Sequence, residues 1–144
     1  MRIHTIVLAA VLALSSAVAR ADVTIVQDPD KWIEAAIKDI AAGKTDDFAH
    51  NFLKLIDKQN VFDAFSEKLR VLSRIGPPAF MEKVQDVKYG TALREVIYVA
   101  LYRQTDYMYF KFTVKKNNGG WLISNFQFKS EPADLFPKDF VPPQ

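Results

Sequence analysis

The chain has 144 residues, a formal net charge of +2 at pH 7 and no cysteine. Disulfide bonds, thiol chemistry and lipid attachment through a cysteine are therefore excluded. The length predicts a single domain that is large enough to be held together by the burial of apolar side chains.

Residues 1–21 have the pattern of a secretory signal peptide. Arg2 gives a positive start, an apolar run extends from Ile6 to Leu14, and small residues precede cleavage patterns that end at Ala19 and Ala21. The apolar run is too short to span a bilayer, so we favour cleavage after Ala21 over a membrane anchor. We expect a secreted or periplasmic protein without membrane insertion after signal removal. A single domain over residues 22–131 would precede a proline-rich tail over residues 132–144.

The charges of the remaining chain are balanced. Removing Arg2 and Arg20 from the 19 basic residues leaves 17, which match the 17 acidic residues. A neutral chain without a basic cluster has little to offer a phosphate backbone, so we expect no nucleic-acid binding. No motif of the sequence indicates a cofactor, and we expect none.

The first half of the sequence predicts three helices. Asp28 and Pro29 are typical of a helix start, Gly43 ends this helix, and a second helix begins at Thr45. A third helix ends at the sequence IGPP, residues 75–78. The apolar stripes of the three helices are Ile33, Ala36, Ile37 and Ile40, then Phe48, Phe52, Leu55 and Ile56, then Phe62, Phe65, Leu69 and Leu72.

The second half predicts strands. Residues 81–90 are a weak candidate, whereas residues 93–103, 106–116 and 121–129 are rich in β-branched and aromatic side chains. The sequence NNGG, residues 117–120, supplies the positive φ angles that a tight hairpin turn needs. We therefore predict an α+β fold with N-terminal helices packed on a curved antiparallel β-meander of about four strands.

Three features carry a resemblance to a known superfamily. They are Gly43-Lys44 after the opening helix, the Gly76-Pro77 break, and a closing hairpin with the sequence GGWLISNFQF. Over residues 32–129 this layout resembles the nuclear transport factor two-like superfamily, the cone-shaped fold of the ketosteroid isomerases. The resemblance implies a pocket between the concave sheet and the helices, and homodimers formed through the sheet. Its enzymes commonly use an aspartate base or a tyrosine donor, but none of their catalytic motifs aligns with this chain.

The strand over residues 106–116 has large side chains at odd and even positions, so both faces of the sheet need an explanation. We predict a two-residue loop of Gln104 and Thr105, and a three-residue turn at residues 118–120. These turns would give the helix-facing side the pairs Ile97–Phe112, Val99–Phe110, Leu101–Met108, Phe112–Phe126 and Phe110–Phe128. The opposite face would carry Tyr98, Tyr102, Tyr107, Tyr109, Lys111 and Trp121, with Ile123 beside them.

Three interpretations of this tyrosine-rich face stay open. The tail covers it through Leu135, Phe136 and Phe140, or two copies pack sheet to sheet, or the tyrosine hydroxyls and Lys111 bind a small molecule in an apolar cleft. A homodimer fits better than a ligand, because the resemblance implies a pocket on the other side of the sheet.

His50, Asp86 and Glu95 are candidate polar groups of a pocket between the helices and the sheet. His50 lies four residues after Asp46, a spacing that suits an acid–base pair or simply a solvated helix surface. Glu95 would oppose Val114 on the helix-facing side, where burial would raise its pKa. One histidine after the signal, with no cysteine, predicts no metal site.

The preferred function is a small exported domain without catalysis that binds a partner or itself through the tyrosine-rich face. The alternative is a carrier of a small apolar ligand, or a pocket enzyme, with a cleft between the helices and the sheet. We expect the side chains of Phe52, Phe65, Phe110 and Phe112 to fill that cleft.

Overall fold

The structure is a computed structural model that describes residues 24–103 and 106–136. The expected signal peptide lies outside the described residues, and so does Phe140. In the part of the chain that is described, no helix combines the length and the apolar character that crossing a membrane requires.

Three helices form where the apolar stripes predict them: α1 (Pro29–Ala41), α2 (Thr45–Leu55) and α3 (Phe62–Ile75). The Asp28 side chain caps α1 by accepting a hydrogen bond of 3.0 Å from the Lys31 backbone N–H. A short 3-10 helix, η1 (Gln59–Val61), separates α2 from α3. Gly76 follows α3 with a φ angle of 85°, which glycine adopts without strain.

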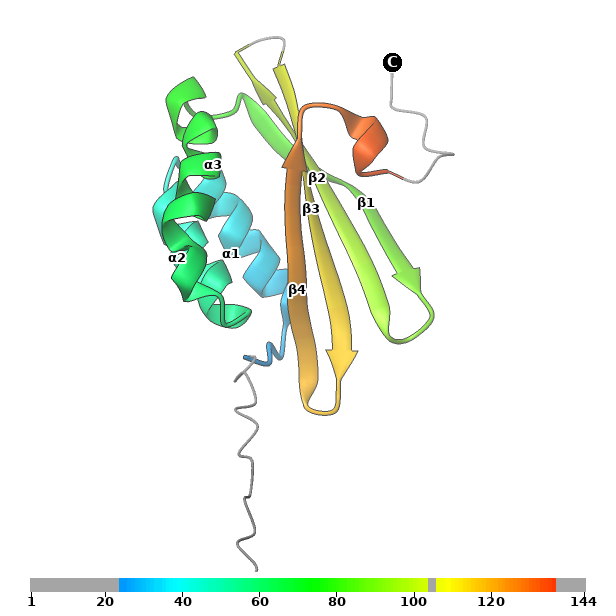
Figure 1. Cartoon of the computed structure of the whole chain (residues 1–144). Helices are drawn as coiled ribbons and strands as arrows, with labels where there is room; N and C mark the ends of the chain where they lie inside the picture. Colours follow the sequence, from blue (N-terminus) through cyan, green and yellow to red (C-terminus); the bar gives the residue numbers. More distant parts are fainter. Residues whose placement is uncertain (1–23, 104–105, 137–144) are drawn as a thin grey trace, which may run out of the picture.

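Four strands follow: β1 (Phe80–Tyr89), β2 (Leu93–Tyr102), β3 (Asp106–Asn117) and β4 (Gly120–Lys129). They pair in sequence order as an antiparallel meander, and the predicted α+β fold is confirmed. After β4 the chain forms a short 3-10 helix, η2 (Pro132–Asp134). The helices cover one face of the sheet, and the segment that contains η2 lies against the other face (Figure 1).

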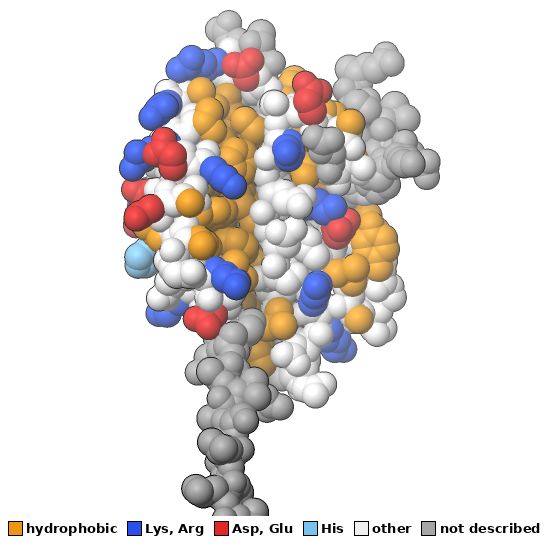
Figure 2. Space-filling view, viewed as in Figure 1, with side chains coloured by type: hydrophobic (Ala, Val, Ile, Leu, Met, Phe, Trp, Pro, Cys, Tyr) orange, Lys and Arg blue, Asp and Glu red, His pale blue; other side chains and the backbone are white. Residues whose placement is uncertain are grey.

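Aromatic rings fill the space between the helices and the sheet. Phe126 on β4 lies with its ring centroid 4.7 Å from that of Phe48 and 5.0 Å from that of Phe112. Trp32 on α1 packs its edge against Phe112 as well. Figure 2 shows a band of apolar side chains along the line where the helical layer meets the sheet. The apolar stripes of the helices and one face of the sheet therefore share a single core.

The predicted register between β2 and β3 is wrong by one residue. Phe112 pairs with Val96 and not with Ile97, and Tyr102 pairs with Asp106. Arg103 has a φ angle of 46° and belongs to the turn, which is one residue longer than we predicted. A one-residue slip exchanges the two faces of a strand. Every residue of β2 therefore lies on the face opposite to the one that we predicted.

The second hairpin contains the predicted phenylalanine pairs, but its turn differs from the predicted one. Asn117 pairs with Gly120 across a two-residue turn, and the register then shifts at a bulge opposite Thr113 and Val114. Ser124 is the extra residue of this bulge, and it restores the pairs Phe112–Phe126 and Phe110–Phe128. The phenylalanine pairs are thus confirmed, whereas the three-residue turn is wrong.

The bulge also decides the side on which the start of β4 packs. Ile123 is 2% exposed and lies in the core beneath the helices, and Trp121 packs against the same core. Their predicted place on the opposite face is therefore wrong. The backbone of Val26 pairs with Trp121 through two hydrogen bonds of 2.7 and 2.9 Å, which adds a residue from before α1 to the edge of β4.

Deleting Ser124 should destabilise the protein strongly. Without the bulge, either Ile123 and Trp121 or Phe126 and Phe128 would turn away from the core. Burying one large apolar side chain contributes about 1.5 to 3 kcal/mol, so we expect the unfolding free energy to fall by about 3 to 6 kcal/mol in a urea titration.

The matched control is Ser124→Ala, which keeps the length of the strand. It loses only the 3.3 Å hydrogen bond that the Ser124 hydroxyl donates to the Thr113 carbonyl, worth about 1 kcal/mol. Equal losses of stability in the two variants would contradict the role of the bulge.

Candidate interaction surface

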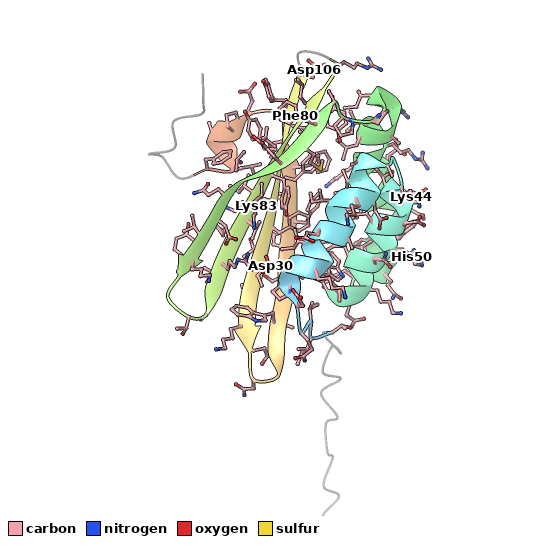
Figure 3. The ribbon with its side chains drawn as sticks, turned by 180° about the vertical axis from the view of Figure 1, so that it is seen from behind. Asp30, Lys44, His50, Phe80, Lys83 and Asp106 are labelled. Carbon is pink, nitrogen blue, oxygen red and sulfur yellow. The ribbon has the colours of Figure 1, made fainter. Side chains whose placement is uncertain are left out.

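The face of the sheet that turns away from the helices is the candidate interaction surface, and we call it the open face. Figure 3 shows the molecule from behind, again with the sheet between the helices and the segment that contains η2. The paired residues cross the open face in rows. From one end to the other, the rows contain Phe80, Leu101 and Tyr107; then Glu82, Val99, Tyr109 and Lys129; then Gln85, Ile97, Lys111 and Gln127; then Val87, Glu95, Thr113 and Asn125.

The first row exposes an unusual amount of apolar surface. Phe80 is 40% exposed and Tyr107 is 47% exposed, with the partly buried Leu101 between them. Tyr89 lies beyond the opposite end of the rows and is also exposed. Large exposed aromatic side chains that cluster on one face are typical of contact surfaces.

Residues 130–136, which we call the C-terminal strap, cover the centre of the open face. Leu135 is 2% exposed and forms a second, smaller core with Phe136 and Ile97. Val84 and Tyr109 pack against this cluster, and the rings of Phe136 and Tyr109 meet edge to face at 5.5 Å. The prediction that Leu135 and Phe136 dock on the domain is therefore confirmed.

A polar network holds the middle of the open face and one atom of the strap. The Lys111 ammonium lies 2.9 Å from a Glu95 carboxylate oxygen and donates a hydrogen bond of 3.3 Å to the Leu135 carbonyl. The Tyr89 hydroxyl donates a hydrogen bond of 3.2 Å to the other Glu95 oxygen. Burial raises the pKa of the neighbouring Tyr109 hydroxyl, with a smaller contribution from Tyr107. The Tyr109 hydroxyl therefore stays neutral at physiological pH.

The structure separates the six residues that the sequence placed on one face. Tyr107, Tyr109 and Lys111 lie on the open face as predicted. Tyr98 and Tyr102 lie on the helix-facing side because the register of β2 differs, and Trp121 lies there because of the bulge.

Tyr102 is the most deeply buried of the misplaced residues. It is 1% exposed, and burial raises the pKa of its hydroxyl to about 12. Within the described part of the chain its hydroxyl has no hydrogen-bond partner. It therefore acts mainly as a core side chain between α3 and the sheet end, not as a contact residue.

Asp86 belongs to an ion-pair cluster that the sequence did not reveal. The Arg94 guanidinium donates hydrogen bonds of 2.6 and 2.5 Å to Asp86, and of 3.0 and 2.5 Å to Asp30 at the start of α1. Lys83 lies 3.4 Å from Asp86, and Figure 3 shows Lys83 and Asp30 on the same side of the sheet. Because Arg94 engages both carboxylates, the cluster ties α1 to β1 and β2.

A surface pocket of about 420 Å³ adjoins this cluster, at the end of the domain where β1 turns into β2. Lys88, Gly90, Thr91 and Trp121 line it together with Asp30 and Arg94. Two of its three charged lining groups, Asp30 and Arg94, pair with each other.

The two other candidate pocket residues lie away from the core. Glu95 pairs with Thr113 and lies on the open face, so its predicted place opposite Val114 is wrong for the same one-residue reason. His50 is exposed on α2, and its ring lies 5.0 Å from that of Phe62. Asp46 accepts a hydrogen bond from Ser66 instead of pairing with His50. Among the described residues, no group of three or more acidic or histidine side chains could hold a metal ion.

The space between helices and sheet holds side chains where the resemblance implies a pocket. Phe52, Phe110 and Phe112 are 3% exposed or less, and Phe65 packs partly buried against them. Comparison of the chain with protein-family models, with curated proteins and with solved structures found no match. The resemblance to the nuclear transport factor two-like superfamily stays a prediction.

Sequence reasoning missed Phe80, Glu82 and Arg94. Phe80 and Glu82 alternate with Met81, which packs on the helical core, so a strand placed one residue earlier would have put both on the open face. The contact of Arg94 with Asp30 had no local signal, because the two residues lie 64 positions apart in the sequence.

The Arg94 cluster should make the protein less stable in acid. Hydrogen bonds from Arg94 lower the pKa of both Asp30 and Asp86, so these carboxyls take up protons more readily in the unfolded chain. Their stabilisation is complete above the ordinary aspartate pKa of about 4 and is lost as the pH falls through the lowered values. Urea titrations at pH 5 and pH 3 should show this loss.

Replacing Asp30 and Asp86 by asparagine provides the comparison. The double variant should be less stable than the natural chain at pH 5, and the difference should shrink at pH 3. An equal difference at both pH values would show that the cluster does not contribute through its charges.

Proposed function

We propose that this protein is an exported, non-catalytic interaction module that associates with a second copy of itself through the open face of its sheet. The observation that carries the proposal is the set of large aromatic side chains exposed on that face, with Phe80 and Tyr107 in one row. Export is proposed from residues 1–21 alone, which have the composition of a signal peptide.

The charges on the open face favour a second copy as the partner. Consider a two-fold axis that runs parallel to the strands between two facing sheets, a geometry close to the aligned packing common in sheet sandwiches. This axis places β1 of one copy over β4 of the other and keeps every residue in its row. Glu82 then faces Lys129 of the second copy, and Lys129 faces its Glu82, because both belong to one row.

The same axis brings apolar groups together in the first two rows and places Lys111 opposite Ile97 of the second copy in the third. Leu101 meets Tyr107 of the second copy, and Val99 meets Tyr109, so apolar groups face one another. Glu95 faces Thr113, and no two like charges of the rows oppose each other. A surface that is complementary to itself in both respects supports a homodimer over an unrelated partner.

The alternative of a small-molecule carrier or pocket enzyme receives less support. Such a function needs an open cleft lined by apolar groups and a few convergent polar groups. In the described structure the rings of Phe48, Phe112 and Phe126 meet in the middle of that space. His50 and Glu95 both lie outside it, so the candidate polar groups do not converge.

Charge reversal at the two ends of one row tests the proposal. Glu82→Lys should weaken the dimer roughly ten-fold or more, because the new lysine would face Lys129 of the other copy at both symmetry-related positions. Lys129→Glu should weaken it similarly, and the double variant should regain the affinity of the natural chain. Sedimentation equilibrium over a range of concentrations measures the dissociation constant.

Glu34→Lys is the matched control, since it makes the same change of charge on the exposed side of α1. It should leave the dissociation constant unchanged. A natural chain that stays monomeric at millimolar concentration, or a double variant that does not recover, would contradict self-association through the open face.

A further inference from the structure

The C-terminal strap divides the open face into separate apolar patches. It contacts Tyr109 in the second row and Ile97 in the third, whereas Phe80 and Tyr107 in the first row stay exposed. Tyr89 is exposed beyond the other end of the rows. A stable interface buries on the order of 800 Å² on each partner over a continuous surface. With the strap docked, a second sheet cannot lie flat on this face.

Side-chain contacts attach the strap to the open face. Its main attachments are the side chains of Leu135 and Phe136, together with one hydrogen bond from Lys111 to the Leu135 carbonyl. The backbone hydrogen bonds that Leu135 and Phe136 donate go to Pro132, inside the strap itself.

The third row of the open face contains one buried polar atom that has no partner among the described residues. Gln85 lies in the same row as Ile97, and its side-chain oxygen accepts no hydrogen bond from the described residues. An unsatisfied buried acceptor opposes the docking of whatever covers it.

We propose that the C-terminal strap is a built-in competitor that occupies the centre of the open face and must leave before a second copy can bind there. This inference rests on the proposed self-association and adds its regulation. Release of the strap uncovers Ile97 and Val84. These side chains then form one continuous surface with the exposed first row and Tyr89. The full chain therefore dimerises more weakly than its open face alone allows.

The experiment replaces the two anchoring side chains in the full chain. Leu135→Ser with Phe136→Ser should lower the dimer dissociation constant roughly ten-fold or more, because each buried side chain is worth more than the free energy of a ten-fold change. The main core does not contain these residues, so circular dichroism should show unchanged helix content. Ala133→Ser, at an exposed position of the same strap, should leave the dissociation constant unchanged.

A synthetic peptide of residues 130–136 gives a second test. Added to the double variant, it should bind over Ile97 and Val84 and restore the monomer, whereas the same peptide with both replacements should not. Amide exchange of the natural chain gives a third test that needs no variant. The Leu135 amide, which donates a 2.9 Å hydrogen bond to the Pro132 carbonyl, should exchange faster as the protein concentration rises.

The outcomes separate this inference from the proposed function. If the folded double variant dimerises no more tightly than the natural chain while Glu82→Lys still weakens the dimer, only the competing strap is overturned. A folded double variant with a weaker dimer would also overturn it and would make the strap part of the interface. If the natural chain and all variants are monomeric, both the proposed role of the strap and the proposed self-association are contradicted. If the double variant does not fold, Leu135 exchange that is independent of concentration overturns the inference.

Discussion

The packing of Phe112 against Phe126 is the constraint from which the rest of the structure follows. These rings lie on neighbouring strands, and each also contacts Phe48 on α2. Because strand side chains alternate, placing these two rings under the helices fixes the face of every other residue in β3 and, up to the bulge, in β4. The hairpin turn would put them out of register, and the extra residue Ser124 restores it. Here burial of large side chains prevails over regular pairing.

The same constraint creates the open face. If Phe110 and Phe112 point inward, Tyr109 and Lys111 must point to the face that α1, α2 and α3 do not cover. A sheet covered on one face only is common in antiparallel folds, but the uncovered face is usually polar. Here it carries tyrosines and aliphatic residues from β2, such as Ile97, and part of the chain's own C-terminal segment covers it. The role of this surface therefore depends on whether the C-terminal strap covers it.

Local patterns were sufficient to predict the α-helices and the strands, since each α-helix has a periodic apolar stripe and three of the four strands have a β-rich sequence; β1 had the weakest pattern. The faces of β2 and the start of β4 were not predictable, because they depend on single residues in turns. One additional turn residue at Arg103 turned over β2, and one bulged residue moved Trp121. Neither has a sequence signal as strong as a glycine or a proline. For the candidate surface, β3 residues were therefore placed correctly and β2 residues were not.

The first strand is attached to the helical layer in a different way from the other three. On the side that faces α1 it presents Met81 and then Lys83, Asp86 and Lys88, so charge replaces aromatic packing along most of its length. Its link to α1 passes through the Arg94 guanidinium, whose side chain is only 10% exposed. Its partner Asp30 is 52% exposed, so added salt weakens the attraction, whereas protonation of the aspartates removes it. Acid should therefore loosen this edge of the sheet before the core opens, and amide exchange in β1 should rise first as the pH falls.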